Sequence, residues 1–152
     1  MMLPRLTLLA AAAALLVACG GSDDPPRRGA LLDPPTPVAM LSAAEIDAVT
    51  AGNGLQPLTG TARCDVKVMK LDYATIGPRG ERTNATGVLL APTGEPGSDC
   101  ATSAAPLDAY ARGTDVNKSR ALAKPTDPET GLLIAFFAAQ GYAVVATDYL
   151  GY

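Results

Sequence analysis

The sequence predicts an α/β fold in which an antiparallel hairpin is followed by parallel strands joined by a crossover helix. Three observations support it: two alternating stretches separated by a Gly- and Pro-rich turn, a short apolar stretch leading into a polar loop, and a helix followed directly by an all-apolar strand. This order is typical of parallel sheets covered by helices. The predicted domain covers residues 42–152.

The start of the chain is predicted to be an export signal rather than part of this domain. Residues 1–18 carry one Arg and then a Leu and Ala run that ends at Cys19, which is typical of a secretory signal peptide. This run is too short to cross a hydrocarbon core of about 30 Å, which argues against a transmembrane anchor. Residues 16–19, LVAC, resemble the bacterial lipobox, in which the cysteine receives lipid.

The lipobox resemblance implies an exported bacterial lipoprotein that contacts the membrane through lipidated Cys19. The next residue is Gly20 rather than Asp, and in this it resembles lipoproteins that are sent to the outer membrane. The alternative is an ordinary cleaved signal, which would leave the protein in the periplasm or outside the cell.

Residues 19–41 are predicted to be a tether. They are dense in Pro, Gly and charge and show no apolar period, so they cannot bury enough surface to offset their chain entropy. Pairs of prolines favour an extended spacer. The charged residues at 23–24 and 27–28 favour a solvated linker over a docking site for a partner.

Composition narrows the possible functions. The chain has 12 Lys and Arg against 15 Asp and Glu, a net charge of −3, which gives no electrostatic reason to expect nucleic acid as a partner. It has no His, the commonest general base and metal ligand. We find no motif for a metal or a cofactor and expect neither.

The two remaining cysteines, Cys64 and Cys100, are an even pair in an exported protein, which predicts a disulfide. On the chain-entropy model it would stabilise the fold by about 3 to 4 kcal/mol. Two buried free thiols are the alternative.

The first predicted elements are a short helix and the hairpin. Ser42 and Glu45 have capping-box spacing, and the helix that they begin ends at Gly52. Residues 64–76 alternate as a strand, with a change of face near Val68 that indicates a bulge or a strand covered on both sides. After a Gly-Pro-Arg-Gly turn, residues 83–91 return as the second strand.

Two further strands flank the clearest helix. Residues 106–111 are a short candidate strand, and residues 142–148 are a buried one. Between them, residues 126–129 supply an N-cap, a proline at the first helical position and an acidic first turn, and Gly141 closes the helix. Its predicted inward face consists of four large side chains: Leu132, Leu133, Phe136 and Phe137.

The ends of these two strands carry the candidate site. Ligands of parallel sheets bind beyond the carboxyl ends of the strands. Arg112, Gly113 and Thr114 follow the first strand, and Asp148 follows the second.

Two segments, PLDAYARGTDV and DPETGLLIAFFAAQGYAVVATDYLGY, resemble the N-terminal part of α/β-hydrolases, in particular secreted bacterial and fungal lipases and esterases. The likeness covers residues 60–152. It implies that the domain is the N-terminal portion of an α/β-hydrolase sheet, incomplete here. It also implies a serine-dependent hydrolase of acyl esters.

The same resemblance implies oxyanion-hole residues. A His-Gly pair often follows the first parallel strand of these enzymes, but Arg112 stands here, so the role falls to the backbone N–H groups of Gly113 and Thr114. An Asp matching Asp148 lies at the oxyanion hole in related lipases. The alternative for Asp148 is that it caps the following loop. Arg112 itself is expected to be an exposed, solvated side chain.

No catalytic residue is expected in this chain. None of its serines has glycine at both flanking positions, and a serine without a general base is a poor nucleophile. The resemblance implies that the triad lies beyond residue 152. We therefore expect this chain to be the first part of a lipid-anchored ester hydrolase, either a fragment or a truncated product. As written it should be inactive. Its last strand should be an interior strand of the sheet that lacks a neighbour. The alternative is a small non-catalytic lipoprotein that binds a partner or has a structural role.

Overall fold

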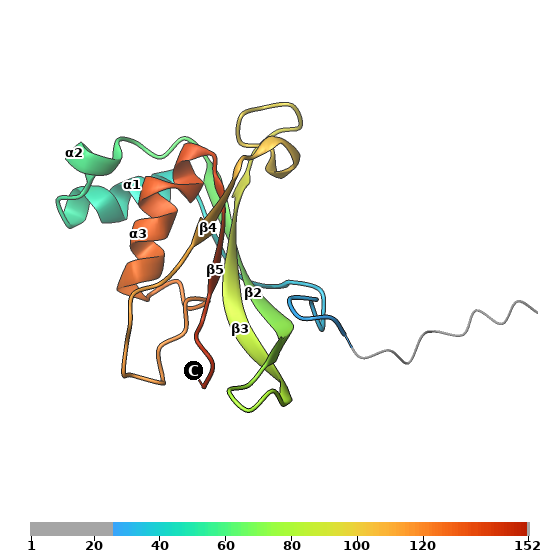
Figure 1. The fold of residues 1–152 in the computed structure, drawn as a ribbon. Coiled ribbons are helices and arrows are strands. Elements are labelled where there is room, and N and C mark those ends of the chain that lie inside the picture. The colour runs from blue at the N-terminus through green and yellow to red at the C-terminus, as the bar shows by residue number, and fades with distance from the viewer. Residues whose placement is uncertain (1–25, 152) are drawn as a thin grey trace, which may run out of the picture.

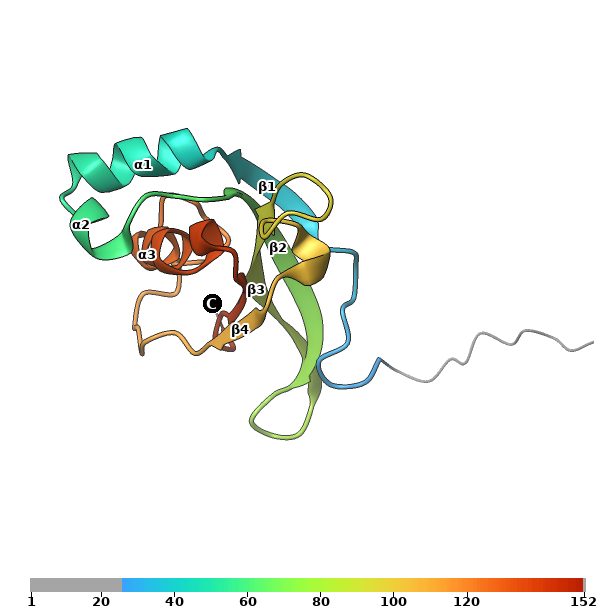
Figure 2. The same cartoon turned by 90° about the horizontal axis from the view of Figure 1, so that it is seen from above.

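A computed structural model describes residues 26–151 and shows one mixed sheet with helices over one face (Figures 1 and 2). The five strands follow the order β1-β2-β3-β5-β4. They are β1 (Thr36–Leu41), β2 (Asp65–Ile76), β3 (Arg82–Thr93), β4 (Leu107–Tyr110) and β5 (Ala143–Thr147). The helices are α1 (Ala43–Gly52), α2 (Gln56–Thr59) and α3 (Pro128–Phe136), with 3-10 turns η1 (Thr102–Ala104) and η2 (Ala138–Gln140). This arrangement agrees with the predicted α/β class.

The predicted hairpin is confirmed. Strands β2 and β3 pair antiparallel along their whole length with no shift of register. The change of face near Val68 coincides instead with a bulge in the neighbouring strand. The β1–β2 register shifts between Pro37 and Ala39, which pair with Met69 and Val68.

The structure corrects the predicted tether, because its last residues form strand β1. Pro37 is tolerated there since an edge strand can accept a residue without an N–H group. The side chains of β1 are mostly exposed, so no apolar alternation marked it in the sequence. Farther upstream, the Gly29 N–H donates to the Ala74 carbonyl at 2.7 Å. The predicted signal and Cys19 lie outside the described residues.

Helix α1 begins at the predicted capping box. The Ser42 hydroxyl accepts the Glu45 N–H at 3.3 Å, and the Glu45 carboxylate accepts the Ser42 N–H at 2.8 Å. Helix α3 likewise begins as predicted, with Asp127 as its N-cap and Pro128 at its first position.

The predicted inward face of α3 is largely wrong. Leu133 is buried, but Leu132, Phe136 and Phe137 are 37–42% exposed. The helix ends at Phe136, and the η2 turn brings the fully buried Ala138 and Ala139 into the core. Small side chains let this turn approach the sheet closely, whereas the phenyl rings stay at its rim.

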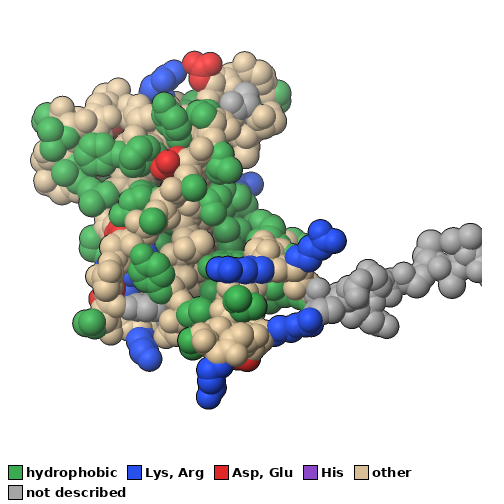
Figure 3. Space-filling model, in the orientation of Figure 1, with side chains coloured by type: hydrophobic (Ala, Val, Ile, Leu, Met, Phe, Trp, Pro, Cys, Tyr) green, Lys and Arg blue, Asp and Glu red, His purple; other side chains and the backbone are tan. Residues whose placement is uncertain are grey.

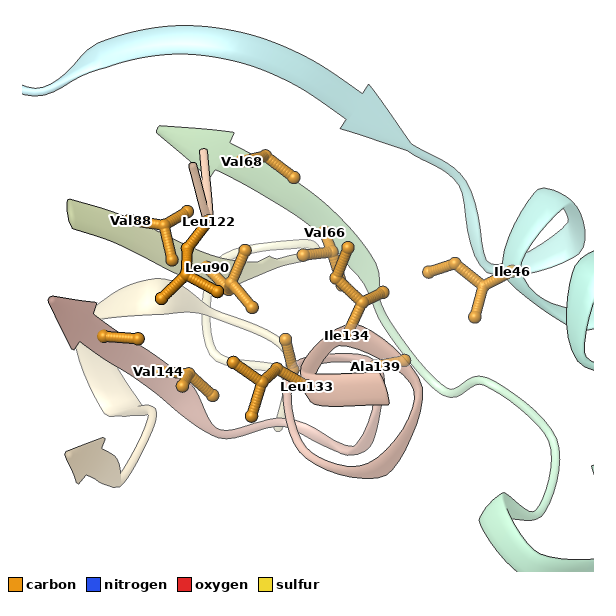
Figure 4. Close-up of a cluster of buried hydrophobic side chains, with 12 residues drawn as sticks. Ile46, Val66, Val68, Val88, Leu90, Leu122, Leu133, Ile134, Ala139 and Val144 are labelled. Carbon is orange, nitrogen blue, oxygen red and sulfur yellow. The ribbon is translucent and has the colours of Figure 1, made fainter. Parts of the chain in front are cut away.

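The core lies between the helices and the sheet, and Figure 4 shows its side chains. It is built from both strands of the hairpin, from β5, from the loop before α3 and from the helices. Its buried members are Ile46, Val66, Val68, Val88, Leu90, Leu122, Leu133, Ile134, Ala138, Ala139, Val144 and Ala146.

Strand β5 is interior, as predicted, but it does not lack a neighbour. It pairs antiparallel with β3 on one side and parallel with β4 on the other. The strand with the unpaired edge is β4 and not β5 as the sequence predicted. This is because the crossover brings β5 back between β3 and β4. Within residues 26–151, no strand pairs with the outer edge of β4.

Cys64 and Cys100 form a disulfide with Cα atoms 5.4 Å apart. It joins the start of β2 to the loop that follows β3. In the part of the chain that the structure describes, no helix combines the length and apolar character needed to span a bilayer.

Candidate functional site

The loop after β4 and the residue after β5 meet at one edge of the sheet. Because these strands are parallel, their carboxyl ends lie side by side. Arg112 and Asp148 are each only 2% exposed, and Arg112 Nη1 lies 3.2 Å from Asp148 Oδ1. The expectation that Arg112 is solvated is therefore wrong, because Asp148 draws its guanidinium into the protein.

Asp148 joins three parts of the chain. Its Oδ1 accepts hydrogen bonds from the Arg112 guanidinium and, at 3.0 Å, from the Leu122 N–H. Its Oδ2 accepts the Thr86 hydroxyl of β3 at 2.7 Å. A buried carboxylate requires such partners, since an unpaired one would lose its hydration without compensation.

A second arginine organises the acidic side chains around this loop. Arg120 makes a bidentate contact with Asp127, at 2.9 and 3.0 Å. It also pairs with Asp115 and with Glu129. The remaining side of Arg112 faces the same two acids, Asp115 at 3.6 Å and Glu129 at 3.9 Å.

These contacts perturb the acid groups. The hydrogen bonds from Arg120 lower the pKa of Asp127, against the opposing effect of burial. The pKa of Asp115 is also lowered, first by the hydrogen bond from the Asn117 N–H and then by Arg120. Both carboxyl groups are therefore held in the charged form.

Glu129, in the first turn of α3, holds the predicted oxyanion turn. Its Oε1 accepts the Gly113 N–H at 3.1 Å and the Tyr110 hydroxyl at 2.7 Å. The hydrogen bond to Glu129 raises the pKa of Tyr110, because the negative acceptor disfavours a phenolate. The Gly113 N–H thus already has an acceptor, and Thr114 beside it is exposed.

The structure brings Gly113, Thr114 and Asp148 to one edge of the sheet. Its contacts show Asp148 as a carboxylate that fixes the loop at residues 111–127. Sequence reasoning missed the roles of Asp115, Arg120 and Glu129. The segment carries charges of both signs between two apolar elements, but a solvated loop does so as well, so this pattern alone did not reveal the roles.

No group of acidic, His or Cys side chains in the described ranges is arranged to hold a metal ion. An apolar cavity of about 140 Å³ lies elsewhere, between α1 and α3. Its lining includes Ile46, Val49 and Ile134, and its one charged side chain is Glu45 of the capping box rather than a member of the Arg112–Asp148 cluster.

Solved structures of other proteins have a similar fold. A rice cell wall degrading esterase, LipA from Xanthomonas oryzae, matches with 35% sequence identity and a TM-score of 0.65 over 83% of this chain. A ligand-bound form of LipA matches with 33% identity, the same TM-score and the same share of this chain. This fold is esterase-like.

A protein from Legionella pneumophila assigned as a hydrolase shares the fold, with a TM-score of 0.64 and 22% identity over 80% of this chain. The chain spans 30% of the length of LipA and 31% of the Legionella protein. No family model and no curated protein sequence matches it. The esterase-like fold of this chain thus corresponds to under a third of each relative.

Proposed function

We propose that this chain supplies the N-terminal portion of a carboxylic-ester hydrolase of the α/β-hydrolase type. The observation that carries the proposal is the 35% identity with an esterase across 83% of the chain. In this proposal, the partial domain contributes the hairpin, the β4–β5 pair and the loop at their carboxyl ends. The neighbours do not favour the alternative of a non-catalytic binding module.

The proposed chemistry is attack on an acyl ester by a serine that this sequence does not contain. Such a serine needs a base to take its proton, and the sequence has no His. The contribution of these residues is positional: Asp148 and Arg112 fix the loop that borders the site, and Glu129 holds Gly113. Gly113 could serve an oxyanion only if Glu129 released its N–H.

The edge of β4 gives the proposal a structural corollary. The outer edge of this strand is where a further parallel strand would extend the sheet. A strand there would end beside Arg112 and Asp148, at the edge where side chains of parallel sheets meet their ligands. We propose that the nucleophile is delivered on that strand.

The test is to read and express the coding region beyond Tyr152. A G-x-S-x-G motif followed by a His supports the proposal if the extended protein hydrolyses p-nitrophenyl esters and its Ser→Ala variant does not. The chain as given should show no hydrolysis above the buffer rate. A downstream region without such residues, or ester hydrolysis by residues 1–152 alone, would contradict the proposal.

We also propose that Cys19 carries lipid and anchors the protein to a membrane, on the strength of the LVAC sequence. Each buried CH₂ of an acyl chain contributes about 0.8 kcal/mol to anchoring. Metabolic labelling with a fatty acid and mass spectrometry of the mature N-terminus test this directly. A Cys19→Ala variant that labels equally would contradict it.

A further inference from the structure

We propose that the tip of the β2–β3 hairpin, together with the N-terminal stretch that docks beside it, is a contact surface for anionic lipid headgroups. We call it the hairpin-tip patch, and it consists of Arg27, Arg28, Leu31, Ile76, Arg79 and Arg82. The inference goes beyond ester hydrolysis and rests on the proposed lipid at Cys19 only for the distance from the membrane.

Backbone pairing brings these distant residues together. Leu31 forms an isolated antiparallel bridge with Tyr73 of β2, and the Gly29 N–H donates to Ala74. Ile76 pairs with Arg82 where the two strands end. Arg27 and Arg28 therefore lie at the same end of the hairpin as its turn. Figure 3 shows Lys and Arg side chains gathered around the place where the described part of the chain begins.

The charge of the patch contrasts with the rest of the molecule. All four of its arginines are exposed, and among residues 26–151 no ion pair engages them. The whole chain, by contrast, has a net charge of −3. Because the protein as a whole is negatively charged, attraction to an anionic partner would come from this local cluster of arginines and not from the net charge.

Three acidic groups among the described residues lie near the patch and reduce its charge, and two more, Asp23 and Asp24, precede Arg27 closely in the sequence. The Glu81 carboxylate turns back to accept the Arg79 N–H at 2.9 Å, and Asp72 accepts the Asn84 amide at 2.9 Å. Asp33 is exposed. Among residues 26–151 the four arginines outnumber these three acids, two of which are engaged in local hydrogen bonds.

Apolar side chains stand among the arginines. Leu31 is 49% exposed and Ile76 is 43% exposed. Guanidinium groups beside aliphatic side chains suit the boundary between headgroups and acyl chains. There the guanidinium groups contact the headgroups while the aliphatic side chains contact the acyl chains. An acidic soluble partner would satisfy the charges but would leave the apolar side chains in water.

The length of chain before the patch favours a membrane as the partner. Only residues 20–25 separate Cys19 from Pro26, and even when fully extended this connection spans at most about 25 Å. A lipid on Cys19 would therefore hold the patch within reach of the headgroups. The contact then becomes an intramolecular one at high effective concentration.

Such contact would also orient the candidate site. Both β2 and β5 are antiparallel to β3, so they run in the same direction. The hairpin tip after Ile76 and the site residue Asp148 therefore lie toward the same end of the sheet. With the patch on the bilayer, this edge is turned toward the membrane, which favours lipid-borne esters as the substrate class of the proposed hydrolase.

The absence of Trp allows a direct test. Ile76→Trp places one reporter at the tip, and Leu58→Trp places a control on exposed α2. The full-length protein, processed and purified, is inserted into vesicles with brominated acyl chains, made of phosphatidylcholine with or without phosphatidylglycerol. We expect the tip reporter to be quenched several-fold more in the anionic vesicles, and the α2 reporter to be quenched equally in both.

Charge variants made in the Ile76→Trp protein distinguish an effect of the patch from an effect of the protein's overall charge. Replacing Arg27, Arg28 and Arg79 with Gln should abolish the extra quenching, and raised salt should do the same. Replacing Arg63, Lys118 and Lys124 removes three cations elsewhere and should preserve it.

Equal quenching in both kinds of vesicle, or an equal loss in the two triple variants, would overturn the proposal. Mass spectrometry of Cys19 reads the anchor separately. No step measures ester hydrolysis, so the proposed activity can fail without affecting this result.

Discussion

The β2–β3 hairpin and the loop at residues 111–127 are held in place by different forces. The hairpin has a continuous backbone ladder and buries Val66, Val68, Val88 and Leu90. The loop has no regular secondary structure; the buried Arg112–Asp148 ion pair fixes it to the end of β5, and the partly buried Arg120–Asp127 pair joins two points within it. The hairpin should therefore respond mainly to packing changes, and the loop to changes of charge.

The largest expected effect comes from removing a buried charge. Asp148→Asn removes the nearest carboxylate from the buried Arg112 guanidinium and leaves only the longer contacts with Asp115 and Glu129, which should lower the free energy of unfolding by about 3 to 5 kcal/mol. Urea denaturation measures it. Asp99→Asn is the control, because Asp99 pairs with Arg63 on the surface and should change stability by less than about 1 kcal/mol.

Replacing both partners sharpens this prediction. The double variant Arg112→Met with Asp148→Leu should be more stable than Asp148→Asn alone, since it removes both charges of the pair instead of leaving the guanidinium buried. If Asp148→Asn and Asp99→Asn had equal effects, the buried pair would not be what fixes the loop.

The next effect concerns the covalent link at the hairpin. Cys64→Ala with Cys100→Ala should destabilise the protein by about 3 to 4 kcal/mol, because the unfolded chain is no longer cross-linked. Thermal melting with and without a reductant measures it. The reductant should lower the melting temperature of the natural protein to that of the variant and leave the variant unchanged.

A smaller effect is expected where the hairpin joins β5. A Cβ at Gly87 would lie 2.5 Å from the Ala146 carbonyl oxygen, so Gly87→Ala should cost about 1 to 3 kcal/mol. Gly131→Ala in α3 is the matched control, since a Cβ there meets no atom within 4 Å. It should stabilise the helix by up to about 1 kcal/mol, so stabilisation by both changes would contradict the close approach.

The smallest effect is local and depends on pH. The pKa values of Asp127 and Asp115 are lowered in the folded protein. Their stabilisation is present above the ordinary carboxyl pKa of about 3.9 and is lost as the pH falls through the lowered values. Hydrogen exchange, corrected for intrinsic rates, should show the loop losing protection below about pH 4 while the hairpin keeps it.

An arginine variant checks this pH dependence. Arg120→Gln removes the main cause of the lowered Asp127 pKa, so the loop should lose protection at a higher pH. If the hairpin and the loop lost protection together, the loop would not be a separate electrostatic unit.

The same contrast explains what the sequence could predict. The hairpin, the Ser42 capping box and the N-cap at Asp127 depend on residues close together in the chain, and all three were predicted. Arg112 and Asp148 lie 36 residues apart, and only the parallel pairing of β4 and β5 brings them into contact. Neither position alone indicates that the arginine is buried.

Two other features of the structure could not be predicted from the sequence, for physical reasons. Strand β1 is an edge strand with mostly exposed side chains, so its formation depends on backbone pairing, which leaves no apolar pattern. At the end of α3, the small Ala138 and Ala139 of η2 occupy the core in place of Phe136 and Phe137. Apolar size is a poor guide where a turn must approach a sheet closely.

The stretch that pairs with β2 ahead of β1 also has a mechanical consequence. It is held by few backbone bonds, including those from Gly29 to Ala74 and from Leu32 to Asp72, at 2.7 and 3.0 Å. A pull on the N-terminal end would load these bonds before any bond of β1. The stretch would detach first and lengthen the chain ahead of β1 while the five strands stayed intact, so a pulling force would be relieved before it reached the sheet.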